Sequence, residues 1–155
     1  MTTVVVDSRQ FRARMVKLGI LIESSEIAKV AGLDILAFVA DNFQTEGRSG
    51  GAGWKPLAAS TIARRRKGGR AGLRDRILQD TGKLKQSFIP GQPENVFRRF
   101  GGRGIDVGTT LSYAPYHEFG GGRIPQRKML PTREKAQQIA AKSIEAIIRE
   151  RTKSI

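Results

Sequence analysis

Two stretches of apolar residues at helical spacing limit the folds that this chain can adopt. The first begins at Ser24 or Ser25, ends before Gly47 and is broad enough to form the main core helix. The second is a C-terminal helix with Thr132 as its N-cap. Their apolar positions are Ile27, Val30, Ala31, Ile35, Phe38, Val39 and Phe43 in the first and Ala136, Ile139, Ala140, Ile144 and Ile147 in the second. Both helices need an apolar surface to pack against, and the rest of the chain has to supply it.

Short runs of strand-forming residues lie between these helices and before them. Residues 96–100 and 105–108 are separated by glycine-rich turn residues, which predicts an antiparallel pair of strands. Residues 4–6, 88–89 and 129–130 are interpreted as further short strands, the last at an edge of the sheet. Helices at both ends with strands between them indicate an α+β fold, in which a small antiparallel sheet is packed by two or three helices.

Shorter helices and one turn complete the expected structure. One helix would run from Asp7 or Ser8 through Leu18, a second would start near Ser60, and residues 113–119 would form a single turn. Residues 84–88 fit either a short helix or an extended segment. Asp-Thr-Gly at residues 80–82 has the composition of a tight turn or a helix cap, in which the glycine is free to adopt a positive φ.

The size and the composition of the chain are those of one ordinary domain. It has 155 residues and a mass of 17.0 kDa, so residues 1–155 are expected to fold as one unit. It holds no cysteine, so neither a disulfide framework nor a thiolate metal site can form. The first residues lack the features of a signal peptide, and no apolar run approaches the ~18 residues of a membrane helix. We therefore expect a soluble protein that is made inside the cell and has no membrane partner.

Positive charge and glycine are concentrated in the middle third of the sequence. The formal net charge is +14, and residues 48–103 hold fourteen Lys and Arg against three Asp and Glu. The same region holds many of the 18 glycines, a composition that favours exposed and mobile backbone. These features predict a long, flexible, basic and Gly-rich loop or arm at about residues 47–76.

The side chains that catalysis requires are scarce. His117 is the only histidine, and with no cysteine present the chain offers few groups for proton or acyl transfer. His117 and Glu118 look like the start of a zinc-protease helix, but Gly121 stands where the second histidine would be. The glycine-rich stretches lack the Gly-Lys-Ser/Thr ending of a phosphate loop. The sequence therefore predicts no enzyme, no catalytic residue, no metal site and no cofactor, and it predicts a packing or hydrogen-bonding role for His117.

A run of basic residues in the predicted arm is a candidate for contact with an anionic partner. It comprises Arg64, Arg65, Arg66, Lys67, Arg70, Arg74 and Arg76. These side chains suit non-specific contact with DNA phosphates, and they suit an acidic protein neighbour equally well. No standard base-reading motif occurs and aromatic residues make up only 6% of the chain, which argues against sequence readout and against stacking on single strands. A basic protein that contacts nucleic acid non-specifically is the alternative function.

Aromatic and apolar residues at two places are candidates for a contact between subunits. They are Trp54, Pro56, Leu57, Tyr113, Tyr116, His117 and Phe119. Trp54 fits either an interface anchor or an ordinary core contact. Residues 113–120 hold two tyrosines, a histidine and a phenylalanine, and they suit either a core plug or a subunit contact.

Four blocks of sequence, taken in their order along the chain, carry a family resemblance. They are GWKPL at 53–57 with STIARR at 60–65, ILQDTGKLKQS at 77–87, VGT at 107–109 with YAPYHEFG at 113–120, and IPQRKML at 124–130. In this order they resemble the tail-completion or virion-morphogenesis proteins of Mu-like and P2-like tailed phages, and more loosely the head-tail joining proteins of long-tailed phages. The chain departs from the family pattern at Met129, where an aromatic residue is usual, in its basic insertion at 68–76 and in the turn at 101–104.

The resemblance implies a non-catalytic virion subunit at the head-proximal end of the tail, in the neck or tail-terminator ring. Its partners would be copies of itself in a homo-oligomeric ring, expected to be a hexamer, and the neighbouring tail-tube, terminator and head-connector proteins. Such a ring closes only through heterologous interfaces. Genomic DNA in the lumen would tolerate basic walls. The protein would be found in the host cytoplasm during assembly and at the head-tail junction of the virion afterwards.

Overall fold

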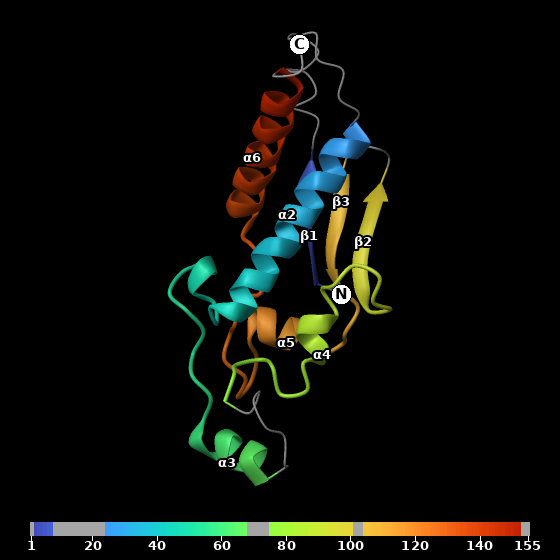
Figure 1. Ribbon diagram of the computed structural model, residues 1–155. Helices are drawn as coiled ribbons and strands as arrows, with labels where there is room; N and C mark the ends of the chain where they lie inside the picture. Colours follow the sequence, from blue (N-terminus) through green and yellow to red (C-terminus); the bar gives the residue numbers. More distant parts are fainter. Residues whose placement is uncertain (1, 8–23, 68–74, 101–103, 153–155) are drawn as a thin grey trace.

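The computed structural model describes residues 2–7, 24–67, 75–100 and 104–152. Its elements are β1 (Thr2–Asp7), α2 (Ser24–Gln44), the 3-10 helix η1 (Arg48–Gly50), α3 (Ala59–Lys67), α4 (Lys83–Gln86), β2 (Asn95–Phe100), β3 (Gly104–Thr109), α5 (Ala114–Phe119) and α6 (Arg133–Thr152). Helices packed on one small sheet confirm the predicted α+β class (Figure 1). The helix expected at about residues 8–18 lies outside the described residues.

Three antiparallel strands form the sheet in the order β1-β3-β2. β2 and β3 are the predicted pair of strands, and in their register Asn95 lies opposite Thr109. β1, predicted at residues 4–6, pairs with the other edge of β3. β3 is therefore the central strand, and its side chains Ile105 and Val107 are fully buried.

α2 crosses one face of the sheet and contacts all three strands (Figure 1). Ile35 and Val39 on its buried face join Ile105 and Val107 in the main apolar cluster. Gly32 marks a close approach of helix and sheet, because a Cβ atom there would lie 2.5 Å from Cδ1 of Ile105. The predicted main core helix is confirmed, and it packs against the central strand.

α6 packs beside α2 through both apolar and polar contacts (Figure 1). Ile27 and Ile144 form a small apolar cluster between the two helices. The hydroxyl of Ser143 donates a hydrogen bond to the carboxylate of Asp34. Thr132 caps the helix as predicted, since its hydroxyl accepts a backbone N–H of the first turn at 3.3 Å.

The core continues away from the sheet at the C-terminal end of α2. Phe43 packs edge-on against Trp54, with ring centroids 5.3 Å apart, and lies 6.1 Å from the ring of Phe88. Phe88 lies in a turn after α4, so the strand predicted at residues 88–89 is wrong. The apolar pair is divided between core and surface, because Phe88 is buried whereas Ile89 is exposed.

Met129 and Leu130 are buried, but the edge strand predicted for them is also wrong. Their two N–H groups donate to the carboxylate of Glu118. The carbonyl of Met129 accepts a hydrogen bond from Nδ2 of Asn42 at 3.1 Å. Polar side chains satisfy this backbone in place of a neighbouring strand, which lets an apolar loop be buried.

The long Gly-rich loop predicted at about residues 47–76 is not confirmed. Up to residue 67 the chain forms η1 and α3, and Trp54 between them is buried. Gly47 has a φ of 88° and lies against the Trp54 ring, where a Cβ atom would stand 2.4 Å from Cδ1. Residues 68–74 lie outside the described residues. Figure 1 shows α3 at one end of the molecule, away from the sheet.

Candidate functional site

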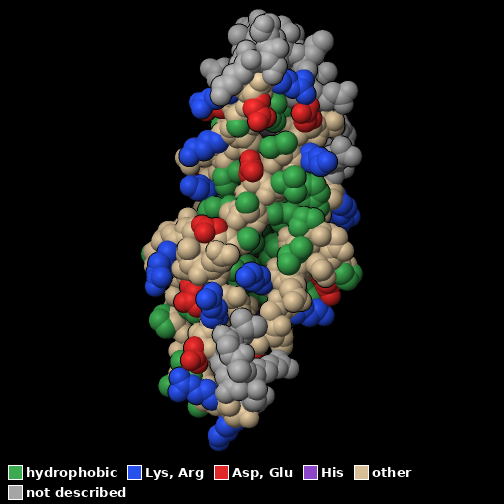
Figure 2. Space-filling view, in the orientation of Figure 1, with side chains coloured by type: hydrophobic (Ala, Val, Ile, Leu, Met, Phe, Trp, Pro, Cys, Tyr) green, Lys and Arg blue, Asp and Glu red, His purple; other side chains and the backbone are tan. Residues whose placement is uncertain are grey.

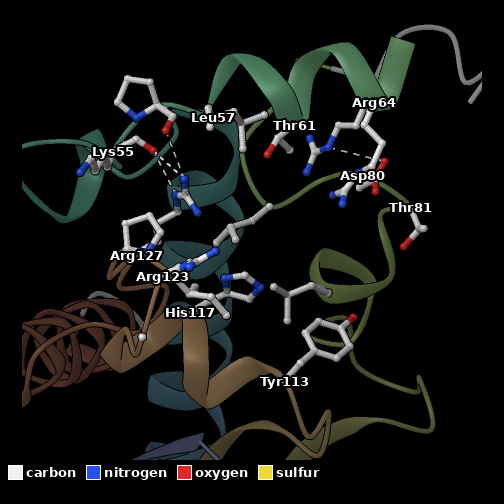
Figure 3. A pocket seen from close by; sticks show the side chains of 18 residues that line it. Lys55, Leu57, Thr61, Arg64, Asp80, Thr81, Tyr113, His117, Arg123 and Arg127 are labelled. Carbon is white, nitrogen blue, oxygen red and sulfur yellow. Dashed lines mark hydrogen bonds and ion pairs between the residues drawn. The ribbon is translucent and has the colours of Figure 1, made fainter. Parts of the chain in front are cut away.

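A hollow of about 930 Å³ lies between α3 and α5 (Figure 3). Its lining comes from residues 55–58, from α3, from residues 78–84 and from residues 113–127. Each of the four sequence blocks described above contributes to this lining. Segments that are distant in the sequence meet here, so the hollow is the candidate functional site.

Arg127 holds two walls of the hollow together. Its buried guanidinium donates through Nε and Nη2 to the carbonyl oxygen of Lys55, each at 3.0 Å, and through Nη2 to that of Pro56 at 3.3 Å (Figure 3). Burial lowers the pKa of Arg127 from its ordinary value, and the charge of Arg65 lowers it further. The planar guanidinium directs several donors at these carbonyls at once, which a lysine ammonium cannot reproduce. Arg127 thus fixes the segment before α3 against the segment after α5.

The loop that follows Arg127 is held by hydrogen bonds with two further buried side chains, Glu118 and Trp54. Oε2 of Glu118 accepts the N–H of Met129 at 2.7 Å and that of Leu130 at 3.2 Å. Nε1 of Trp54 donates to the carbonyl of Lys128 at 2.9 Å. Burial raises the pKa of Glu118, while the two backbone N–H groups act against that rise. Glu118 therefore locks α5 to the loop through its carboxylate.

The Asp-Thr-Gly turn forms another wall. Gly82 has a φ of 76°, as the turn prediction required, and the hydroxyl of Thr81 accepts the N–H of Lys83 at 3.3 Å. Oδ1 of Asp80 lies 3.6 Å from Nε of Arg65 on α3. This ion pair is partly exposed and contributes little stability. The turn is structural, and it also positions an acidic group beside α3.

His117 and Tyr113 form the aromatic side of the hollow (Figure 3). Their ring centroids are 6.2 Å apart and the rings are nearly perpendicular, at 85°. Nδ1 of His117 is buried and has no hydrogen-bond partner among the residues that the structure describes. Burial lowers the pKa of His117, and the charge of Arg127 lowers it further. The fold therefore favours the neutral imidazole at this place.

The charge around the hollow is strongly one-sided. The charged residues of its lining are Lys55, Arg64, Arg65, Arg123, Arg127 and Asp80. Arg65 and Arg127 make the contacts given above. The side chains of Lys55, Arg64 and Arg123 are exposed and make no hydrogen bond or ion pair with any residue in the described ranges. The hollow thus offers positive charge to a ligand.

A metal centre has no basis in the described segments. No group of three or more His, Asp or Glu residues within them is placed to hold an ion. His117 and Glu118 have different roles, since His117 lines the hollow whereas the Glu118 carboxylate accepts hydrogen bonds from the backbone.

None of the helices in the described segments is long and apolar enough to cross a membrane.

The structure places the predicted interface residues in three different environments. Pro56, Leu57, Tyr113 and His117 line the hollow. Tyr116 and Phe119 protrude from α5, with 60% and 69% of their surfaces exposed. Trp54 is buried against Phe43 within its own chain. The structure thus presents a recessed group and, beside it, an exposed aromatic pair.

The predicted anion-contacting residues are also divided. Arg64 and Arg65 on α3 line the hollow. The others lie outside the lining: Arg66, Lys67 and Arg76 are exposed, and Arg70 and Arg74 fall outside the described residues. An ion pair of 3.3 Å joins Arg66 to Asp75.

Sequence reasoning assigned no site role to Lys55, Arg123 or Arg127. A signal for Arg127 was present, because it stands in the block at 124–130 between apolar residues on either side, and a charge buried among them has to be hydrogen-bonded. Lys55 and Arg123 carry no comparable signal, since exposed basic residues are common throughout this chain.

The site is a charged surface for contact, supported by buried polar groups that hold backbone in place, which is the class of a binding or assembly protein. The sequence profile of the phage virion morphogenesis family matches residues 9–151, and the chain belongs to this family. No curated protein and no solved structure matches the chain. The predicted family is confirmed, and the protein has a structural and assembly role in the phage virion.

Proposed function

We propose that this protein completes the phage tail and joins it to the head, as one subunit of a homo-hexameric ring at the head-tail junction. The virion morphogenesis family supports a role in assembly with other virion proteins. The four ordered blocks support tail completion in particular, because their order resembles that of tail-completion proteins, and all four contribute to one site.

The main observation in support of a hexameric ring is the aromatic pair on α5. Tyr116 and Phe119 are the most exposed large apolar side chains of the described residues. Glu118, on the same helix, is locked into hydrogen bonds with the backbone of Met129 and Leu130. α5 therefore presents both rings from a fixed helix, and exposed aromatic side chains of this kind mark protein interfaces.

A closed ring needs two different surfaces on each subunit. Apart from α5 and the rim of the hollow, exposed large apolar side chains occur at Leu33 on α2 and at Ile89 after α4. Figure 2 shows hydrophobic side chains gathered along the middle of the face on which α2 lies. In the proposed ring, α5 of one subunit packs against this α2 face of the next.

Electron microscopy of particles made without this protein tests the proposal. We expect heads and tails that fail to join, with defective tail ends, and we expect the wild-type protein to restore joining. The double variant Tyr116→Ser, Phe119→Ser should fail to restore it. The matched control Tyr116→Phe, Phe119→Tyr keeps both rings and should succeed. Normal infectious particles in the absence of the protein would overturn the proposal.

Non-specific contact with genomic DNA in the lumen is a second candidate, favoured by the composition of α3. None of its residues is buried, and Arg64, Arg66 and Lys67 are exposed on it. A salt titration with duplex DNA tests this contact: weak binding that physiological salt abolishes is expected for lumen contact. Tight binding that survives this salt and prefers one sequence would favour a free nucleic-acid-binding protein.

A further inference from the structure

We infer that the hollow between α3 and α5 is a docking site for an acidic segment of a neighbouring virion protein, in which carboxylates flank a large apolar side chain. The nature of the partner rests on the proposed function, whereas the chemistry of the segment comes from the lining of the hollow. Three features support the inference: exposed cations, an apolar wall, and a rigid frame.

The exposed cations are Lys55, Arg64 and Arg123. They come from the segment before α3, from α3 itself and from the loop after α5; Arg64 and Arg123 lie around the hollow, whereas the Lys55 side chain extends outward from its rim (Figure 3). The side chains of all three are exposed and make no hydrogen bond or ion pair with the described part of the chain. Carboxylates entering the hollow would give these cations charge-assisted hydrogen bonds.

The accessible part of the apolar wall is formed by Leu57, Tyr113 and Ile124, and the buried side chains of Leu78 and Leu84 also line the hollow. Leu78 has a φ of 59°, a conformation that is costly for a leucine. Hydrogen bonds on both sides hold it there: the N–H of Ile77 donates to Oε1 of Glu46 at 3.0 Å, and Nε2 of Gln79 donates to a backbone carbonyl at 2.8 Å. The fold thus maintains an apolar side chain on the hollow at a cost in backbone strain.

The rigid frame is the link from Arg127 to the carbonyls of Lys55 and Pro56. It keeps the cation-bearing segments in place before a ligand arrives, which reduces the entropy lost on binding. The volume of about 930 Å³ admits several side chains of an extended peptide.

A protein segment fits the hollow better than DNA does. A duplex would satisfy the cations with phosphates, but protein–DNA interfaces are mostly polar and would leave Leu57, Tyr113 and Ile124 unused. A second copy of this chain is a poor source of carboxylates, because its net charge is +14. An acidic and apolar segment of another virion protein matches both parts of the lining.

The test uses the purified full-length protein and an array of overlapping peptides, each of about fifteen residues, that covers the head and tail proteins of the same phage. We expect the bound peptides to be acidic and to contain a large apolar residue. In fluorescence anisotropy with the tightest peptide, Arg64→Glu with Arg123→Glu should weaken binding by about tenfold or more. The matched control Lys135→Glu with Lys142→Glu makes the same change of charge on exposed positions of α6 and should have little effect.

Several results would overturn the docking site. They are an array without bound acidic peptides, equal weakening by both double variants, and a duplex DNA that binds more tightly than any peptide and is displaced by none. Circular dichroism confirms that each variant is folded. Absence of peptide binding while the wild-type protein still joins heads to tails contradicts the docking site alone. Normal joining without the protein contradicts the proposed function and leaves the peptide result standing.

Discussion

Arg127 and Lys55 are 72 positions apart in the sequence, and the guanidinium of Arg127 donates two hydrogen bonds of 3.0 Å to the carbonyl of Lys55. The two residues belong to the IPQRKML and GWKPL blocks, which are two of the four blocks on which the family resemblance was predicted. Their contact closes one side of the hollow. The blocks therefore build the frame of the site as well as its surface.

Replacing Arg127 tests this frame. Arg127→Lys keeps the charge but cannot bind both carbonyls in the same geometry, so the free energy of unfolding should fall by about 1.5–3 kcal/mol. Urea denaturation of the variant and the wild type measures this free energy of unfolding. Arg123→Lys is the control, because Arg123 is exposed, and its effect should stay within about 0.5 kcal/mol. Equal stability of the Arg127→Lys variant and the wild type would show that the link does not hold the walls.

Glu118 predicts a pH-dependent difference in stability. Glu118→Gln keeps an oxygen that can accept both backbone N–H groups and removes the charge. Because burial raises the pKa of Glu118, the wild type is stabilised by the protonated carboxyl below the ordinary pKa, and it loses this stability as the pH rises through the raised pKa. The free energy of unfolding of the variant relative to the wild type should therefore increase over that range. If the stability difference between Glu118→Gln and the wild type is the same at every pH, the pKa of Glu118 is not raised in the folded protein.

Glu118→Ala is the companion to this experiment. It leaves the N–H groups of Met129 and Leu130 without their acceptor, so it should destabilise the protein by about 1–3 kcal/mol on either side of the titration. If Glu118→Ala is as stable as Glu118→Gln, the hydrogen bonds from the carboxylate to the loop contribute nothing.

Trp54 should behave as a core residue of the single chain. Trp54→Ala should cost about 3–5 kcal/mol, because it removes the contact with Phe43 and leaves a cavity. Trp54→Phe keeps a ring and loses the hydrogen bond to Lys128, so it should cost less. Thermal unfolding of the two variants at low protein concentration measures both. A negligible cost for Trp54→Ala would place the role of Trp54 in the interface.

Gly32→Ala offers a test of the packing of α2 on the sheet. Alanine is favoured over glycine in a helix by about 1 kcal/mol, so the substitution would stabilise an unhindered helix. Here the new Cβ would lie 2.5 Å from Cδ1 of Ile105, and overpacking costs about 1–3 kcal/mol. We expect net destabilisation, relieved only in part by Ile105→Val, which removes Cδ1 but leaves Cε2 of Phe97 at 2.9 Å from the new Cβ. A stabilised Gly32→Ala variant would contradict the close approach.

The sequence predicted those elements whose burial follows a regular period. The main helix from Ser24 and the C-terminal helix capped by Thr132 are amphipathic along their length, and the strands around 96–100 and 105–108 are marked by glycines between them. In these elements the buried side chains recur at the period of the helix or strand, and the apolar residues of the sequence recur at the same period.

The strands predicted at residues 88–89 and 129–130 failed for a different reason. Phe88 is buried from a turn, and Met129 is buried from a loop whose backbone is satisfied by the side chains of Glu118 and Asn42. Short apolar runs do not reveal which groups will satisfy their backbone.

The hollow could be predicted only in part. The four blocks were recognised, yet their meeting depends on contacts such as that of Arg127 with Lys55, which no local pattern encodes. Burial of Trp54 depends equally on distant partners, Phe43 and the carbonyl of Lys128. Local sequence therefore left its interface and core roles open.

Cryo-electron microscopy of purified virions, with protein mass spectrometry of the same particles, tests the central claim most directly. The account predicts that the protein is retained in the mature particle and that its fold is found as a hexameric ring at the head-proximal end of the tail, with α5 in contact with the adjacent subunit. Absence of the protein from purified virions, or its location elsewhere in them, would contradict the account.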